Sequence, residues 1–304
     1  MNNEQIVSVA GLSKKFGTFE AVKDVSFTVN RGDVFGFLGP NGAGKSTTIR
    51  CLLSLISPDK GAVSLFGQSF QSNRREILAN VGSIIEKPDF YRYLSAEKNL
   101  EIFARISGAE VSKKEIQEML DFVGLGDRGK HKVKGFSHGM KQRLGIAQTL
   151  LHKPDLIILD EPTTGLDPQG IVEVRNLILR LKNEQNKTII LSSHQLAEIE
   201  LISNRMVIIN QGRTLVEGRV DELLNAQELV VRFELDRLAE AKSLLNAAYS
   251  DSEINVISDK ELEITLDQGQ IPMVNKLFVE HGINVRAIEP KRKLEDYFLK
   301  TIQS

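Results

Sequence analysis

Two patterns of hydrophobic and polar residues alternate along most of this chain. Short runs rich in β-branched residues indicate strands, and segments with apolar residues three or four positions apart indicate helices. Two of the runs, residues 34–38 and 156–159, are apolar throughout, which is typical of buried parallel strands. The alternation predicts an α/β fold in which helices cover both faces of a parallel sheet.

The pattern becomes helical and rich in polar residues from about residue 95. Helices are expected at residues 97–107 and 113–123, followed by one at 140–151. We interpret residues 95–150 as a small helical lobe inserted between the strands of the core. The other strands of this part are expected at residues 6–9, 22–29, 62–66, 81–85, 188–191 and 205–209. One further helix is expected to begin at residue 45, and two more are expected at residues 169–184 and 195–202.

The character of the chain changes near residue 225. From there the order of expected elements is strand, helix, two strands, helix and strand, which is the split-βαβ order of a ferredoxin-like domain. The sequence therefore predicts two domains, at residues 1–224 and 225–304. The strands of the second are expected at residues 229–235, 254–257, 261–265 and 283–288, its helices at 236–248 and 271–280, and a final helix at 291–301.

Composition and charge restrict the possible partners. The chain has 304 residues, of which 41% are hydrophobic and 26% charged, and its formal net charge is −1. A charge this close to zero argues against nucleic acid as a partner. The single cysteine, Cys51, excludes a disulfide within the chain and fits a reducing compartment. No signal peptide is expected, and no run of 18 apolar residues predicts a membrane span.

A glycine-rich segment with the pattern G-x-x-x-x-G-K-S follows the expected strand 34–38 and precedes a helix, which is the context that a phosphate-binding loop requires. The glycines allow backbone N–H groups to surround phosphates, and the helix N-terminus adds its positive end. Lys45 is expected to reach the outer phosphates, and the Ser46 hydroxyl to bind Mg²⁺. The predicted ATP-binding residues are Gly39, Pro40, Asn41, Gly42, Ala43, Gly44, Lys45, Ser46 and Thr47.

Two carboxylates stand directly after the expected strand 156–159. The carboxyl end of a strand in an open α/β sheet is where ligands bind, so Asp160 is expected to hold Mg²⁺ through water. Glu161 is expected to orient or deprotonate the water that attacks the nucleotide. Two solvated acids at a strand end are the alternative interpretation, which the upstream phosphate loop disfavours.

These segments resemble the ATP-binding cassette of ABC transporters over roughly residues 6–221. The resemblance also rests on the signature segment (residues 137–142, Ser-His-Gly-Met-Lys-Gln), on Gly165-Leu166-Asp167 and on Ser193-His194. It implies a P-loop NTPase fold with a RecA-like parallel core, an antiparallel β portion and an inserted helical lobe. It further implies an ATPase that forms a head-to-tail dimer, either with itself or with a related cassette, and sandwiches ATP between the phosphate loop of one chain and the signature of the other.

The resemblance assigns roles to further residues. Ser137, His138, Gly139 and Met140 would contact ATP held by the partner, and the N-terminus of their helix would face its γ-phosphate. His194 would contact the γ-phosphate and hold the geometry of the water. Asp167 would couple the two sites across the dimer interface, and Phe16 would stack on adenine.

The chain departs from the family pattern at two places. The signature commonly has two glycines and a glutamine where this chain has His138, Gly139 and Met140. Glu86 stands where a glutamine usually links Mg²⁺ and the attacking water to the membrane partner. A carboxylate can still bind Mg²⁺, so Glu86 is expected in both the metal site and the catalytic site, but it cannot donate a hydrogen bond. This variant resembles the ATPases of bacitracin-resistance and lantibiotic-immunity exporters; a neutral change in another exporter is the alternative.

Because the chain is not expected to span a membrane, the resemblance implies a separate membrane permease, with this chain cytoplasmic and bound to the inner face of the membrane through that partner. Three aromatic residues in the segment 87–94 suggest a groove for a helix of the permease, and ordinary packing of the lobe is the alternative. An ATPase acting on ribosomes or DNA and a nucleotide sensor are the two alternative functions. For the C-terminal domain the sequence leaves three roles open, which are dimerisation, ligand binding and bracing of the motor.

Overall fold

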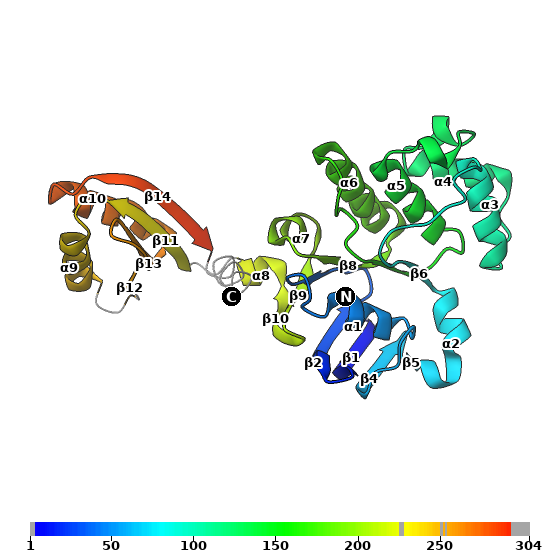
Figure 1. Ribbon diagram of the computed structural model, residues 1–304, viewed down its shortest axis with the longest axis horizontal. Coiled ribbons are helices and arrows are strands. Elements are labelled where there is room, and N and C mark those ends of the chain that lie inside the picture. Colours follow the sequence, from blue (N-terminus) through cyan, green and yellow to red (C-terminus); the bar gives the residue numbers. More distant parts are fainter. Residues whose placement is uncertain (1–3, 225–227, 250–251, 253, 293–304) are drawn as a thin grey trace. The chain divides into compact units, whose positions relative to one another are not determined.

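The computed structural model describes residues 4–224, 228–249, 252 and 254–292 (Figure 1). The chain divides into two compact units, Met1–Arg219 and Val220–Ser304. The boundary predicted at residue 224 lies at the other end of a short helix, α8 (Val220–Leu224), which opens the second unit. Each unit has a hydrophobic cluster of its own.

A six-stranded sheet forms the centre of the first unit, in the order β10-β9-β3-β8-β7-β6. Every neighbouring pair from β9 to β6 is parallel, and β10 joins the edge of β9 in the antiparallel direction. The parallel core is therefore as predicted. The strands are β3 (Val34–Leu38), β6 (Val81–Ile84), β7 (Leu156–Leu159), β8 (Thr188–Ser193), β9 (Arg205–Asn210) and β10 (Arg213–Arg219).

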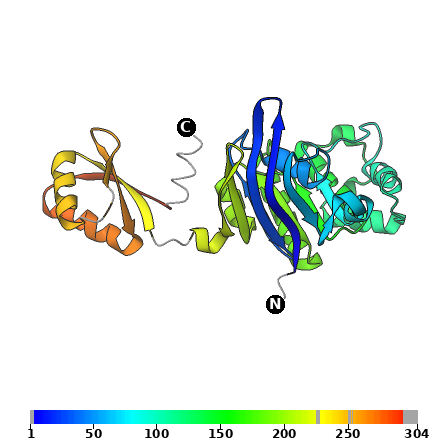
Figure 2. The ribbon, with the colours of Figure 1, turned by 90° about the horizontal axis from the view of Figure 1, so that it is seen from below.

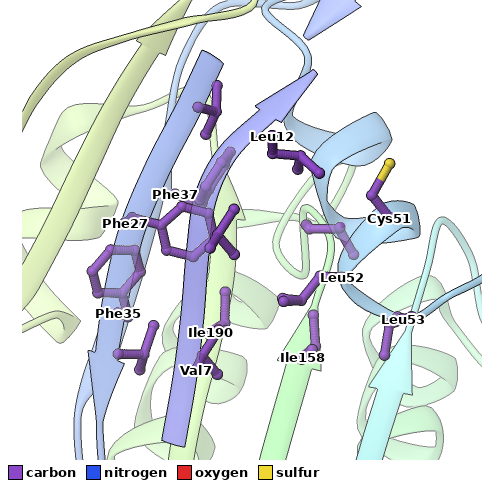
Figure 3. Close-up of a cluster of buried hydrophobic side chains, with 14 of the residues drawn as sticks. Val7, Leu12, Phe27, Phe35, Phe37, Cys51, Leu52, Leu53, Ile158 and Ile190 are labelled. Carbon is purple, nitrogen blue, oxygen red and sulfur yellow. The ribbon is translucent and has the colours of Figure 1, made fainter. Parts of the chain in front are cut away.

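A four-stranded antiparallel sheet, in the order β2-β1-β4-β5, packs against the parallel sheet. Phe27 of β2 lies 5.5 Å from Phe35 and 5.2 Å from Phe37 of β3, measured between ring centroids. Figure 3 shows these rings in the cluster that fills the space between the sheets. The strands are β1 (Gln5–Phe16), β2 (Phe19–Asn30), β4 (Lys60–Leu65) and β5 (Gln68–Ser69).

The helices of the first unit lie around the parallel sheet and in the lobe (Figure 1). The lobe contains α3, α4 and α5, each of which begins after a serine whose side chain accepts a hydrogen bond from the first turn. Such capping satisfies N–H groups that have no partner within the helix. The helices are α1 (Lys45–Leu52), α2 (Phe70–Ala79), α3 (Ala96–Ile106), α4 (Lys113–Phe122), α5 (His138–Thr149), α6 (Pro168–Gln185) and α7 (Leu196–Ile202).

The long strands β1 and β2 cross one face of the first unit, as the dark blue arrows of Figure 2 show. They are longer than the expected strands at residues 6–9 and 22–29, because their pairing continues to the hairpin pair Phe16 and Phe19 through several register shifts. Apolar residues are sparser in these extensions, although Leu12 and Ala21 there are buried. The apolar pattern therefore marked only the densest part of each strand.

The second unit has the predicted ferredoxin-like order. Its strands form an antiparallel sheet in the order β12-β13-β11-β14, and Phe233 and Phe278 meet in its core with ring centroids 5.3 Å apart. The predicted helix 291–301 is wrong at its start, because residues 291 and 292 belong to β14, and its remainder lies outside the described residues. The elements are β11 (Glu228–Leu235), α9 (Leu238–Ala248), β12 (Ile254–Val256), β13 (Glu261–Asp267), α10 (Ile271–Glu280) and β14 (Val285–Arg292).

Candidate ATP-binding and hydrolysis site

The phosphate loop connects the buried end of β3 to the start of α1. Its glycines are needed for close packing: a Cβ atom at Gly39 would lie 2.4 Å from the Ile209 carbonyl oxygen. One at Gly44 would lie 2.5 Å from the Ala21 carbonyl oxygen, and Gly44 has φ +102°. Only glycine accommodates both constraints at Gly44. The loop is thus fixed between β9 and β2.

Lys45, the first residue of α1, lies inside this loop with its side chain 6% exposed. Its ammonium donates to the carbonyl oxygens of Gly39 at 2.7 Å and Pro40 at 3.2 Å, and it lies 3.0 Å from a carboxylate oxygen of Glu161. A buried charge requires such partners. The loop therefore holds one positive charge at its centre, as a site for phosphates requires.

Asp160 and Glu161 follow β7 and are fixed by Ser192 at the end of the neighbouring strand β8. The Ser192 hydroxyl donates to Asp160 at 2.6 Å and accepts from the Glu161 backbone N–H at 2.8 Å. Glu161 itself has φ +50°, which turns its side chain away from the direction that β7 would give it. Ser192 was not found from the sequence, because nothing in its local pattern distinguishes it from other strand serines.

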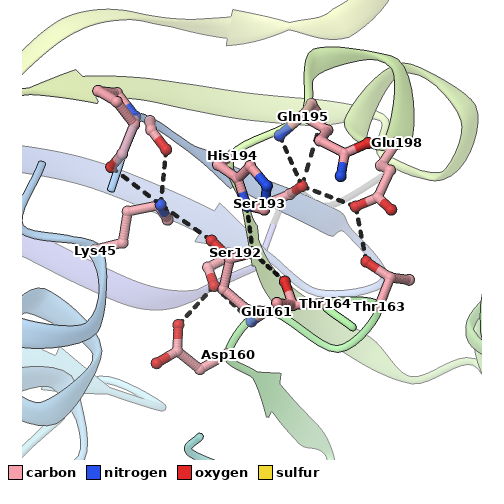
Figure 4. Close-up of polar contacts among 12 residues, drawn as sticks. Lys45, Asp160, Glu161, Thr163, Thr164, Ser192, Ser193, His194, Gln195 and Glu198 are labelled. Carbon is pink, nitrogen blue, oxygen red and sulfur yellow. Dashed lines mark hydrogen bonds and ion pairs between the residues drawn. The ribbon is translucent and has the colours of Figure 1, made fainter. Parts of the chain in front are cut away.

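Three side chains converge on the Glu161 carboxylate (Figure 4). Besides Lys45, the Thr164 hydroxyl donates to it at 2.7 Å, and Nδ1 of His194 lies at 2.8 Å. Burial acts to raise the pKa of Glu161, but the hydrogen bond from Thr164 and the charge of Lys45 outweigh it, so the pKa lies below its ordinary value. Glu161 is therefore a carboxylate at neutral pH and is able to accept a proton.

Glu198 of α7 holds the segments on either side of this carboxylate. One of its oxygens accepts from the hydroxyls of Thr163 and Ser193, each at 2.8 Å. Ser193 immediately precedes His194, so the same carboxylate connects the loop after β7 with the loop after β8 (Figure 4). Glu198 and Thr163 were also missed by sequence reasoning, because their roles depend on contacts between distant segments.

Glu86 is not among the residues that contact the Glu161 carboxylate in the described structure. It follows β6 with φ +64°, and its carboxylate pairs with the guanidinium of Arg50 on α1. Among the described residues, no cluster of three or more His, Cys, Asp and Glu side chains is arranged to hold a metal ion. Mg²⁺ bound to ATP needs few protein ligands, because it keeps waters and phosphate oxygens. Ser46 and the buried Asp160 are oxygen donors of the right chemistry for that role.

The signature segment begins α5. The Ser137 hydroxyl caps the helix by accepting from the Met140 N–H at 3.2 Å. Nδ1 of His138 lies 3.1 Å from the Gly165 carbonyl oxygen, and Asp167 caps α6 by accepting from the Gly170 N–H at 3.0 Å. The structure therefore brings the signature of this chain to the loop that carries Asp167.

Phe16 lies at the end of β1 with half of its surface exposed, and the ammonium of Lys14 lies 5.7 Å from its ring centroid. The strand paired with β1 passes the phosphate loop, since a Cβ atom at Gly44 would lie 2.5 Å from the carbonyl oxygen of Ala21 in β2. An adenine ring against Phe16 stays a prediction.

Comparisons with known proteins agree with this geometry. A family model described as "ABC transporter" matches residues 22–164. The chain is 45% identical to the bacitracin transport ATP-binding protein BcrA of Bacillus licheniformis, over 98% of this chain and 97% of that protein. It is 41% identical to the lantibiotic transport ATP-binding protein SrtF of Streptococcus pyogenes, over 74% of this chain and 95% of that protein. A solved structure of an ATP-binding subunit of an ABC transporter is 33% identical, with a TM-score of 0.63 over 72% of this chain and 91% of that one.

Proposed function

This chain belongs to the ABC transporter family and is one of its ATP-binding ATPases, and we propose that it drives an exporter of antimicrobial peptides through a separate membrane permease. The observation that carries the ATP hydrolysis behind this proposal is the convergence of Lys45, His194 and Thr164 on the Glu161 carboxylate. This arrangement provides a positive charge for phosphates and a proton acceptor beside it. Phosphoryl transfer to water requires both.

The proposed mechanism of hydrolysis starts from the hydrogen bonds and the ion pair that Lys45 and Glu161 make in this structure. The Lys45 ammonium donates to two loop carbonyls and pairs with Glu161, so a phosphate oxygen that reaches it competes with Glu161 for one of its protons. Glu161 would then take a proton from the attacking water, while His194 and Thr164 keep its carboxylate in place. Mg²⁺ held by Ser46 and Asp160, and by Glu86 if its pair with Arg50 opens, would neutralise charge on the phosphates.

The signature segment has the chemistry to bind the γ-phosphate of a nucleotide held by a second cassette. The Ser137 hydroxyl uses one lone pair to cap α5, which leaves its proton for a phosphate oxygen. The N-terminus of the twelve-residue helix α5 adds its positive end. We therefore propose a head-to-tail dimer in which ATP joins the two chains, with Asp167 at the interface. Loss of the γ-phosphate would release them.

The permease would bind beside the helical lobe. A cavity of about 570 Å³ is lined by Glu86, Lys87, Pro88, Asp89, Phe90, Arg92, Val133 and Lys141. Phe90 is buried and packs edge-on against Phe103, so it belongs to the lobe, whereas Tyr93 is exposed. In the part of the chain that the structure describes, no helix has the length and hydrophobicity to cross a bilayer. A membrane-spanning partner would thus supply the path.

The cargo is proposed from the relatives, whose names specify bacitracin transport and lantibiotic transport. Export of such peptides would protect a cell from them, so the resistance of cells to these peptides tests the proposed cargo. Cells lacking this chain are challenged with bacitracin and with a lantibiotic, then complemented with the wild type or Lys45→Ala. We expect the wild type to restore resistance and Lys45→Ala to fail, because the variant lacks the charge that binds the phosphates.

Two controls accompany this experiment. Immunoblotting must show equal amounts of both chains, and ATP titration must show weakened binding by the variant. If Lys45→Ala restored resistance as fully as the wild type, ATP-driven export by this chain would be wrong. If neither chain affected resistance, the peptide cargo would be wrong.

A further inference from the structure

Three consecutive residues after β7, here called the junction loop (Thr163, Thr164 and Gly165), each contact a different functional segment through a hydrogen bond. Thr163 donates to Glu198, which also holds the residue before His194. Thr164 donates to Glu161 at 2.7 Å. The carbonyl oxygen of Gly165 lies 3.1 Å from Nδ1 of His138 in the signature segment. The junction loop therefore connects the signature with the proton acceptor of the same chain.

The His138 ring is fitted to Gly165. A Cβ atom at Gly165 would lie 3.3 Å from Cε1 of the ring, and Gly165 has φ +76°, so a larger residue would be strained and crowded. A carbonyl oxygen only accepts hydrogen bonds, so Nδ1 must carry the proton. Nδ1 is protonated in one neutral tautomer and in the imidazolium, and the bond is compatible with both. A glycine at position 138 would have no donor side chain with which to make it.

We propose that His138 is a positioning residue that couples the signature segment to Glu161 of the same chain through the junction loop. The proposal rests on the dimer described above. In that dimer the signature segment binds the nucleotide held by the partner, while Glu161 acts on the nucleotide held by its own chain. A phosphate that draws in the N-terminus of α5 would move the Gly165 carbonyl with it. Thr164 and its bond to Glu161 would follow, so one site would sense whether the other is filled.

His138→Leu in the full-length chain tests this coupling, because leucine has a similar size but no donor. ATP binding and ATP hydrolysis are measured across a range of ATP concentrations. We expect the dissociation constant to change less than about twofold, because His138 does not touch the phosphate loop. We expect kcat to fall about three- to tenfold, the factor for one lost hydrogen bond, and the Hill coefficient to fall toward one.

Two further variants separate positioning from a general loss of structure. His138→Asn keeps an N–H donor on a shorter side chain and should recover part of the lost kcat. His281→Leu is the matched control, because Nδ1 of His281 also contacts a backbone carbonyl, that of Leu277, in the second unit. It should leave kcat and the Hill coefficient unchanged. An equal loss in His281→Leu would overturn the proposal.

A double-mutant cycle with Thr164→Val tests whether His138 acts through the junction loop. If it does, His138→Leu should lower kcat little further once the Thr164 hydroxyl is gone. Multiplicative losses would overturn the proposal, since they would mean that His138 acts independently, for example on the nucleotide of the partner. Wild-type kinetics in His138→Leu would overturn it as well. A wild-type chain that hydrolyses no ATP would instead contradict the proposed function.

Discussion

At the scale of single residues, the chemistry of the site depends on how the charge of Glu161 is maintained. Lys45, Thr164 and His194 all contact its carboxylate, and together they lower its pKa despite burial. The charged form is therefore favoured in the folded protein above the pH at which a free glutamate ionises. The stabilisation that the charged carboxylate gives to the folded protein is complete above the ordinary pKa of glutamate. It is lost as the pH falls through the lowered pKa of Glu161.

Thr164→Val should move the acidic limb of the pH profile of kcat to higher pH. Among the contacts that lower the pKa of Glu161, the hydrogen bond from the Thr164 hydroxyl is the strongest. Its removal should therefore let burial raise the pKa of Glu161. The wild type should keep its proton acceptor charged down to below pH 4.5, the ordinary value. Single-turnover rates measured from pH 4 to 8 would show the shift.

Thr163→Val is the matched control for this measurement. It removes the same hydroxyl from the neighbouring residue, whose partner is Glu198 instead of Glu161. It should leave the acidic limb in place, whatever its effect on the maximal rate. The ionisation of ATP is common to all variants and cancels in the comparison. Superimposable profiles for Thr164→Val and the wild type would contradict the role given to Thr164.

Local motifs are sufficient to predict Lys45, from the glycine loop, and Glu161, from its place after an apolar strand. They are not sufficient for Ser192, which reaches Asp160 only because β7 and β8 pair in the register Leu159 with Leu191. Register is a long-range property, so no local pattern contains it.

At the scale of elements, α4 of the lobe illustrates how a helix start is specified. Ser112 accepts from the Glu115 N–H, and Glu115 accepts in return from the backbone and hydroxyl of Ser112. The bonds from Ser112, with a further contribution from Lys153, lower the pKa of Glu115 to about 2. This reciprocal pair satisfies N–H groups at the start of the helix.

Ser112→Ala should therefore loosen α4 without unfolding the core. Losing a cap of this kind costs about 1 kcal/mol, which corresponds to roughly fivefold faster amide exchange in the first turns of the helix. Hydrogen exchange with mass spectrometry would measure it. Ser107→Ala, at the end of α3, provides the control, since that hydroxyl donates back to Phe103 and Ala104 and caps no N–H of α4. Unchanged exchange of α4 in Ser112→Ala would contradict this account.

Elements with a strong apolar pattern were predicted well, and several with a weak one were missed. The strand 156–159 and the helix 271–280 have the expected bounds. Helix α2 was missed because it is polar and interrupted by non-helical backbone at Asn73, and β10 because it is an edge strand with charged residues at both ends. Both are stabilised by neighbouring elements more than by a periodic pattern of their own.

At the scale of the whole molecule, the first unit contains every residue assigned to ATP, and the described residues of the second form a ferredoxin-like fold with its own core. We propose that residues 225–304 form an accessory domain of the motor. For the first unit we propose that Glu161 is the proton acceptor for ATP hydrolysis and that Lys45, Thr164 and His194 prepare it for that role.

Single-turnover hydrolysis of ATP by Glu161→Gln tests this claim most directly. Glutamine keeps the shape and the acceptor oxygen for Thr164 but cannot take a proton from water. Glu118→Gln, on the exposed surface of α4, makes the same change away from the site. We predict that Glu161→Gln binds ATP and hydrolyses it at least about 100-fold more slowly than the wild type, as expected for loss of a general base, while Glu118→Gln is unaffected. Hydrolysis by Glu161→Gln at the wild-type rate would contradict the account.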